Sequence, residues 1–217
     1  MDRFNYSQEE TDYIEKFNGT DSKYWENIDP NMDTIKSKIR SYYLPLQKYE
    51  CCYCKMLKQE KNGKAWNIEH IFPRETYPQF TFTPINLAMS CIECNNSKLA
   101  QDIKVGKNPI KRYPKSGSNI KIIHPHLDDY NLHIKVNKSP NGFIFHTPIK
   151  GSKKAKNTIV MCNLFRFQEA AFGSENHYVS SIVSHITKTL SACVSPEMTS
   201  EQMELAIKVA VTSAMEN

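Results

Sequence analysis

The sequence predicts an α+β protein organised around a compact strand–strand–helix unit, which resembles neither a helical bundle nor a large sheet. Three observations lead to this fold class. Two C-x-x-C pairs enclose 36 residues. Two short β-prone stretches lie between these pairs, and a helix-compatible segment follows them. Apolar residues at helical spacing recur before this core and in the last third of the chain, so helices are expected on both sides of it.

The two C-x-x-C pairs predict a structural zinc site formed by Cys51, Cys54, Cys91 and Cys94. Four thiolates suit tetrahedral Zn²⁺ and leave the ion no open position for a substrate. The chain has seven cysteines, and metal binding is favoured over disulfides because cytosolic thiols stay reduced. The other three are expected to be small core residues: Cys52, Cys162 and Cys193.

Composition describes an ordinary soluble protein of 217 residues, with 40% hydrophobic and 24% charged residues. No apolar run approaches the roughly 18 residues that a membrane-spanning helix needs. The first residues lack the charged and then apolar pattern of a signal peptide. We therefore expect a cytoplasmic protein without a membrane partner.

The core is expected to follow the order strand, strand, helix. Residues 65–72 predict the first strand, and residues 85–89 predict a shorter second strand. Asn95 is a favourable residue for the start of a helix, which is expected to run to about Asp102. Residues from there to Ser118 are rich in Lys, Pro, Gly and Ser, and they predict a long basic loop.

Three regions are expected in the chain: an N-terminal helical segment (1–46), the core with its basic loop (47–118) and a C-terminal region (119–217). The capping-box pattern at Ser7 predicts a helix that ends near Asn18, and a second helix is expected between Pro30 and Leu46. The dipeptide Asn141-Gly142 predicts a hairpin between residues 132–136 and 143–146. Further helices are expected at 158–172, around 178–190 and from Thr199 onward.

The motifs of the core stand in the order C-x-x-C, E-H-x-x-P, N-x₈-N and C-x-x-C-N-x-x-K. This order resembles the HNH endonucleases, whose active site is a ββα-metal unit that often carries a cysteine zinc site. The resemblance implies a metal-dependent nuclease that hydrolyses phosphodiester bonds of nucleic acid, with DNA favoured. The alternative is a zinc-stapled module that binds nucleic acid or a protein without cleaving.

Candidate catalytic residues follow from the chemistry and from the resemblance. His70 is the side chain of the motif that can deprotonate a water near neutral pH. Glu69 supplies a hard oxygen ligand, which suits Mg²⁺ or Mn²⁺. Adjacent residues of a strand point to opposite sides, so the resemblance, which makes Glu69 a metal ligand, implies an irregular strand here. The resemblance also implies that Asn95 is a second metal ligand and that Asn86 holds the active-site loop.

Charge is unevenly distributed along the chain. Residues 1–31 carry eight acidic and three basic side chains, whereas residues 95–125 carry seven basic side chains and one acidic. A basic stretch after a nuclease core is suited to tracking phosphates, although a solvated loop would have the same composition. The candidate nucleic-acid-binding residues are Arg74, Lys98, Lys104, Lys107, Lys111 and Arg112.

A wider resemblance includes the motif H-P-x-x-D-D-x-x-x-H and the Gly-containing hairpin that follows it. The layout looks like that of the HNH proteins of Septu-type and retron-associated phage-defence systems. It implies an ABC-type ATPase as partner. The ligand-type residues of this motif surround a proline turn, so a structural role is favoured over a second metal site for His124, His126, Asp128, Asp129 and His133.

Overall fold

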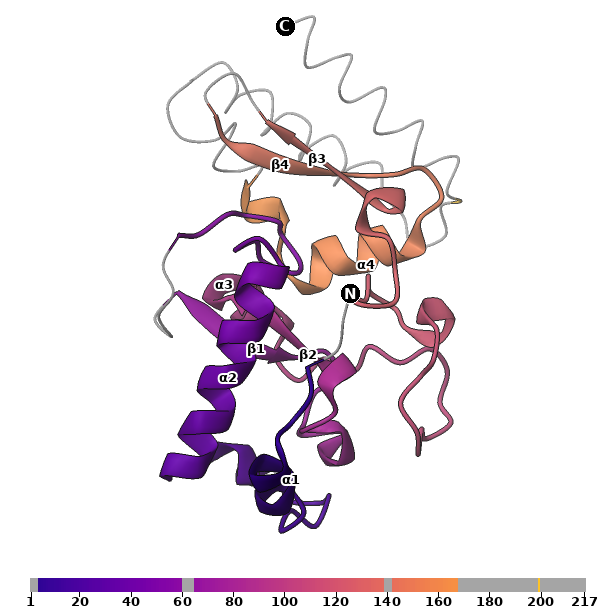
Figure 1. Cartoon of the computed structure of the whole chain (residues 1–217). Coiled ribbons are helices and arrows are strands. Elements are labelled where there is room, and N and C mark those ends of the chain that lie inside the picture. Colours follow the sequence, from indigo (N-terminus) through magenta and orange to yellow (C-terminus); the bar gives the residue numbers. More distant parts are fainter. Residues whose placement is uncertain (1–3, 60–64, 139–141, 168–198, 200–217) are drawn as a thin grey trace, which may run out of the picture. The chain divides into compact units, whose positions relative to one another are not determined.

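The computed structural model describes residues 4–59, 65–138, 142–167 and 199 (Figure 1). The described residues up to 137 and from 146 to 165 belong to one compact unit, and the other described residues before 168 belong to a second. The fold is a mixture of helices and two small two-stranded sheets, in agreement with the α+β prediction. The helices expected around 178–190 and from Thr199, and Cys193, lie outside the described residues.

The N-terminal segment forms two helices joined by a 3₁₀ turn. Helix α1 (Gln8–Ile14) has both hydrogen bonds of the predicted capping box, but it ends before Asn18. Its successor α2 (Pro30–Leu46) begins where it was expected, because Asp29 caps it and Pro30 occupies its first position. Between them lies the 3₁₀ helix η1 (Ser22–Glu26). Helix α2 buries one face against the core, with Met32, Ile35, Ile39 and Tyr43 fully enclosed.

The core unit has the predicted order of elements, with shifted boundaries. Strands β1 (Trp66–His70) and β2 (Leu87–Cys91) pair antiparallel, and α3 (Ile92–Lys98) follows directly. Strand β2 starts two residues later than predicted, because Pro84–Asn86 forms a 3₁₀ turn. Helix α3 starts three residues earlier than predicted, since a cysteine of the zinc motif occupies its N-cap.

The end of α3 also differs from the prediction. Leu99 has φ +45°, a left-handed conformation that stops the helix well before Asp102. Asn95 therefore lies in the middle of a two-turn helix and not at its head.

Helix α2 is fastened to β2 by the amide of Gln47, the residue that follows the helix. Its Nε2 donates to the Met89 carbonyl at 2.8 Å, and its Oε1 accepts from the Met89 N–H at 2.7 Å. The Tyr43 hydroxyl adds a bond to the carbonyl of Pro84 at 2.9 Å. The helix is thus held at a fixed place beside the core sheet.

The predicted hairpin forms from β3 (Ile134–Lys138) and β4 (Ile144–Pro148), with Gly142 at φ +83° before β4. Helix α4 (Lys153–Met161) begins five residues before its predicted start, because the Ser152 hydroxyl accepts from the Ala155 N–H and caps it there. No helix within these described stretches combines the length and the apolar character needed to cross a bilayer.

Candidate active site and zinc site

The four cysteines of the two C-x-x-C pairs lie together in the interior. Their sulfur atoms are all within 4.8 Å of one another, and the Sγ atoms of Cys54 and Cys91 are 3.8 Å apart. Sulfurs at the corners of a tetrahedron around zinc, with Zn–S of about 2.3 Å, are separated by about 3.8 Å. The arrangement therefore fits one zinc ion. No other group of three or more His, Cys, Asp or Glu ligands is found among the described residues.

Backbone hydrogen bonds shape the first C-x-x-C turn. Lys55 takes φ +59°, and its N–H donates to the Cys51 carbonyl at 3.0 Å, which reverses the chain after Cys54. The turn is joined to the second pair, because the Cys91 N–H donates to the Cys51 sulfur at 3.3 Å. Cys52 points into the core, where burial raises the pKa of its thiol. It is a core residue, as expected, and Cys162 is likewise buried.

A cavity of about 620 Å³ lies beside β1. Four successive residues of this strand, Asn67 to His70, line it. The pairing of β1 with β2 runs without a bulge from Trp66 to His70, so the irregular strand that the resemblance implied is absent. Residues that point to opposite faces of β1 thus line one cavity, beside a strand that pairs with β2 alone.

His70 is held by one ring nitrogen. Its Nε2 lies 3.1 Å from the carbonyl oxygen of Thr81, and a carbonyl can only accept, so Nε2 carries the proton. Nδ1 has no hydrogen-bond partner among the described residues, and the ring lines the cavity. Burial and, to a lesser extent, the positive charge of Arg74 lower the pKa of His70 to about 3. The imidazole is therefore neutral at neutral pH, with Nδ1 as its free acceptor.

Glu69 forms a buried ion pair that the sequence did not reveal. Its Oε1 lies 2.7 Å from the ammonium of Lys98 and accepts from the Tyr53 hydroxyl at 3.0 Å. Burial raises the pKa of this carboxyl, and Lys98 opposes that effect. Lys98 is 1% exposed and also donates to the His70 carbonyl at 3.2 Å. It thus lies in the interior, where no backbone phosphate of a substrate would reach it.

Oxygen ligands for a divalent ion are present at the cavity. Both contacts of Glu69 use Oε1, so Oε2 accepts no hydrogen bond from a described residue. Asn95, one turn before Lys98 on α3, also lines the cavity and supplies an amide oxygen. This donor set has the hard oxygens that Mg²⁺ and Mn²⁺ prefer, although the Lys98 ammonium offsets the charge of the carboxylate.

Asn86 binds the loop that follows β1. Its Nδ2 donates to the carbonyls of Phe72 and Phe80, both at 3.1 Å, and its Oδ1 accepts from the Phe72 N–H at 2.7 Å. Because Phe80 precedes Thr81, these bonds fix the backbone whose carbonyl orients His70. Asn86 is fully buried, so it acts on the loop and not on a ligand in the cavity.

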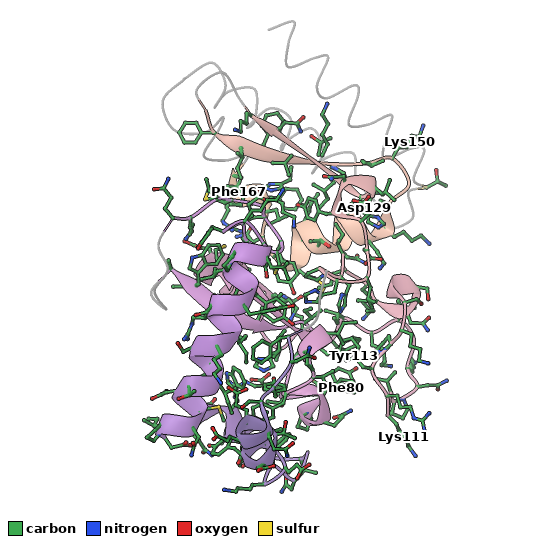
Figure 2. All side chains as sticks on the ribbon, in the orientation of Figure 1. Phe80, Lys111, Tyr113, Asp129, Lys150 and Phe167 are labelled. Carbon is green, nitrogen blue, oxygen red and sulfur yellow. The ribbon has the colours of Figure 1, made fainter. Side chains whose placement is uncertain are left out.

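A chain of hydrogen bonds continues from Asn86 into the histidine motif. The Tyr113 hydroxyl donates to Asn86 Oδ1 at 3.2 Å and lies 2.7 Å from His124 Nε2. His124 Nδ1 accepts from the His126 N–H at 3.1 Å, so Nε2 carries the ring proton. Figure 2 places Tyr113 beside Phe80, and their ring centroids are 5.1 Å apart. The motif therefore supports the loop behind the cavity.

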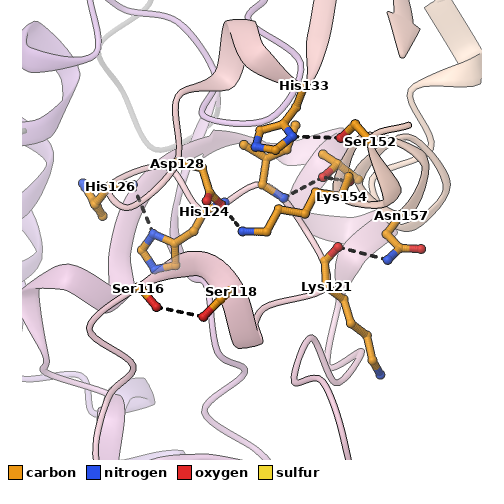
Figure 3. Close-up of polar contacts among 12 residues, drawn as sticks. Ser116, Ser118, Lys121, His124, His126, Asp128, His133, Ser152, Lys154 and Asn157 are labelled. Carbon is orange, nitrogen blue, oxygen red and sulfur yellow. Dashed lines mark hydrogen bonds and ion pairs between the residues drawn. The ribbon is translucent and has the colours of Figure 1, made fainter. Parts of the chain in front are cut away.

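The remaining polar groups of this motif are paired with nearby protein groups (Figure 3). Asp128 accepts from the His124 N–H at 2.7 Å and forms an ion pair with Lys154. His133 Nδ1 bonds the Ser152 hydroxyl at 2.8 Å. Gly117 packs so tightly here that a Cβ would lie 2.1 Å from Asp128 Oδ1. These contacts support the structural role that was favoured for the motif.

Some of the candidate nucleic-acid-binding side chains already bind other protein groups, and others are exposed. Arg74 donates to the Ser22 carbonyl at 2.8 Å and pairs with Glu26 at 2.9 Å, which ties the loop after β1 to η1. Lys104 is buried, and its ammonium bonds the Gly106 carbonyl. The other three candidates are exposed: Lys107, Lys111 and Arg112.

The cavity-lining residues that the sequence did not single out include Trp25, Lys36 and Arg40. They belong to η1 and α2, in the N-terminal segment that was expected to be helical. Their i, i+4 spacing on α2 places Lys36 and Arg40 on one face, but only the docking of α2 against the core brings that face to the cavity.

Comparison with known proteins finds two partial relatives. Over 130 residues, 59% of this chain, the sequence is 30% identical to Septu protein PtuB of Bacillus thuringiensis, and the match covers 42% of that protein. Over 109 residues, 49% of this chain, it is 30% identical to protein ea31 of Escherichia phage lambda, with 30% of that protein covered.

The chain thus spans less than half the length of the curated relatives that it matches. No protein-family model and no solved structure matches it. The chain is thus similar over part of its length to a Septu protein, and it carries a four-cysteine cluster that can hold zinc.

Proposed function

We propose that the protein is a metal-dependent HNH endonuclease that hydrolyses phosphodiester bonds of nucleic acid, with DNA favoured. The observation that supports this most strongly is the state of His70, a neutral imidazole with a free Nδ1 at the wall of a cavity. A module that only binds would not need a base held in this way. The similarity to a Septu protein further supports a role in anti-phage defence. The partner in this proposal is the ABC-type ATPase that the wider motif resemblance implies.

In this proposal His70 Nδ1 accepts the proton of the attacking water, while Nε2 stays bonded to the Thr81 carbonyl. A bound Mg²⁺ or Mn²⁺ would stabilise the charge that develops on the phosphate and on the leaving oxygen. Glu69 and Asn95 would hold that ion through their oxygens. The anionic phosphate would offset the positive groups around His70 and raise its basicity toward the working pH. Structural zinc would stay with the four cysteines.

A second candidate is a zinc-stapled binding module without catalysis. The Glu69–Lys98 ion pair favours it, because the carboxylate that should hold a catalytic ion already has a buried counter-charge. In this alternative the cavity, with Lys36 and Arg40 in its wall, is a binding surface, and His70 takes part in no reaction.

The experiment that tests the proposal is cleavage of plasmid DNA and of tRNA with Mg²⁺ or Mn²⁺, with and without the co-expressed partner. His70→Ala is expected to lower the cleavage rate by about 10²–10⁴, because it removes the general base. The matched control is His133→Ala, a half-buried histidine away from the cavity, which is expected to cut as the wild type does. Equal rates for His70→Ala and wild type would refute the assignment.

Zinc content and circular dichroism of His70→Ala must match those of the wild type, so that a lost rate reports chemistry and not folding. If the wild type cuts neither substrate with either ion, alone or with its partner, the binding module becomes the better description.

A further inference from the structure

Two cations on α2 line one wall of the cavity. Lys36 and Arg40 are one turn apart and both line the cavity wall. Neither forms an ion pair within 4.0 Å with a described residue, and the Nε of Arg40 is buried without a hydrogen-bond partner. A buried guanidinium nitrogen without an acceptor is unfavourable, so this wall lacks an anionic group in the protein alone.

The positive charge is concentrated further by a third cation. Burial lowers the pKa of Lys36, and the charges of Arg40 and Arg74 lower it more, against the attraction of Asp33. Like charges at i and i+4 destabilise a helix. Lys36 and Arg40 therefore repel each other at the cavity, and an anion bound between them would relieve that repulsion.

The carboxylates at the cavity do not neutralise this pair. Glu69 is already paired with Lys98, and Glu75 lies 3.6 Å from the Nε of Arg74. Lys36 contacts Trp25, with its ammonium 5.4 Å from the ring centroid. The same indole meets the His70 ring edge-on, with centroids 4.6 Å apart and planes at 90°. Trp25 thus keeps Lys36 beside the histidine.

We propose that Lys36 and Arg40 bind a backbone phosphate of the nucleic acid next to the bond that is cut. This inference rests on the proposed function and extends it by naming where the strand enters the site, across α2. Arg40 offers its planar fork to a phosphate, and Lys36 adds a point charge. Trp25 is a positioning residue here and not a base-stacking platform, because Lys36 and His70 already contact its ring.

The test measures binding and not cleavage, so it stands apart from the nuclease assay. A short fluorescein-labelled DNA duplex is titrated with the full chain carrying His70→Ala, over a range of salt concentrations. Adding Lys36→Gln and Arg40→Gln is expected to reduce the magnitude of the slope of log K against log salt by about 0.9, since the two side chains bind one phosphate and each phosphate contact contributes about 0.9. Affinity at fixed low salt is expected to fall about tenfold or more.

The matched control removes the same two charges elsewhere, through Lys135→Gln and Lys156→Gln, two exposed residues outside the cavity. The control is expected to keep the slope of its parent. An equal slope change in both double variants would overturn the phosphate site. So would a parent protein that binds no duplex at the lowest salt.

Thermal melting excludes a merely structural role. Because the double variant relieves repulsion, its melting temperature is expected to equal or exceed that of its parent, and a marked decrease together with the slope loss would overturn the inference. If the slope falls as expected while the wild-type chain does not cut, the phosphate site stands and the nuclease proposal fails.

Discussion

The ammonium of Lys98 binds protein groups in the interior and not the substrate, because of the residues that surround it. Its spacing from Asn95 suggested a side chain that meets the substrate, but the short helix α3 carries it inward to Glu69 and the His70 carbonyl. There it compensates a carboxylate that would otherwise be buried with an uncompensated charge. Lys98 therefore stabilises the folded site by compensating the charge of Glu69.

Replacing Lys98 by Met is expected to destabilise the protein by about 3–5 kcal/mol, because Glu69 then loses its buried counter-charge. The double variant Glu69→Gln/Lys98→Met is expected to recover much of that loss, since no charge remains to be compensated. Urea unfolding of the zinc-loaded wild type, of Lys98→Met, of Glu69→Gln and of the double variant gives the four free energies of unfolding that the comparison needs. Additive losses in the double variant would mean that the two side chains do not interact energetically.

At the scale of elements, the two cysteine pairs join segments that are distant in the chain. The first turn packs on β2 through the Cys52 N–H and the Met89 carbonyl, 3.0 Å apart. The second pair begins α3. His146 reaches the first turn as well, with its Nε2 2.7 Å from the Cys54 carbonyl. A ligand lost from this cluster should thus disturb several elements at once.

Cys91→Ser is expected to give insoluble or metal-free protein, because zinc binding to such a cluster is coupled to folding. The measurement is metal content of the purified protein, with about one zinc per chain expected for the wild type. Cys52→Ser, beside the cluster but not part of it, is the control that should retain zinc. Folded, active wild-type protein without zinc would contradict the assignment.

The sequence predicts correctly those structural elements whose formation depends on neighbouring residues. The capping box at Ser7, the hairpin around Gly142 and the two strand segments of the core depend on residues close in sequence. The start of α3 could not be predicted in this way, because Asn95 is a better N-cap by residue type than Cys91. The zinc motif overrides that preference.

The cavity could be predicted only in part. The sequence motif identifies His70 as a candidate base and Glu69 as a candidate metal ligand, because an imidazole and a carboxylate have these properties. The basic wall is different, because Lys36 and Arg40 reach the cavity only through the docking of α2 by Gln47. No signal within α2 alone distinguishes these cations from the solvated face of an ordinary helix.

At the scale of the compact unit that holds the cavity, the cations proposed to bind phosphates lie in two regions. One is the cavity wall on α2. The other is the loop after α3, where Figure 2 shows Lys111 on the side away from α2. Within this loop Lys121 bonds the Asp102 carbonyl at 3.1 Å, and Lys104 bonds the Gly106 carbonyl. These two lysines hold the loop together, which leaves its exposed cations for a long nucleic acid.

Neutralising the exposed loop cations Lys107, Lys111 and Arg112 to Gln is expected to weaken DNA binding and to flatten its salt dependence by about one unit for each lost contact. The reason is that their side chains are exposed, and a backbone that crosses the loop would meet them. Affinity measured across salt concentrations checks this. An unchanged slope would show that the loop is only a solvated surface.

The spacing of the two cysteine pairs determines when, during synthesis, the zinc site can form. Cys54 leaves the ribosome 37 residues before Cys91, and Glu69 and His70 emerge between them. The strands that carry the proposed chemistry are therefore exposed on a nascent chain that cannot yet close its metal cluster. Under the proposed nuclease function, a newborn chain would gain the ability to cut only after the four cysteines bind zinc.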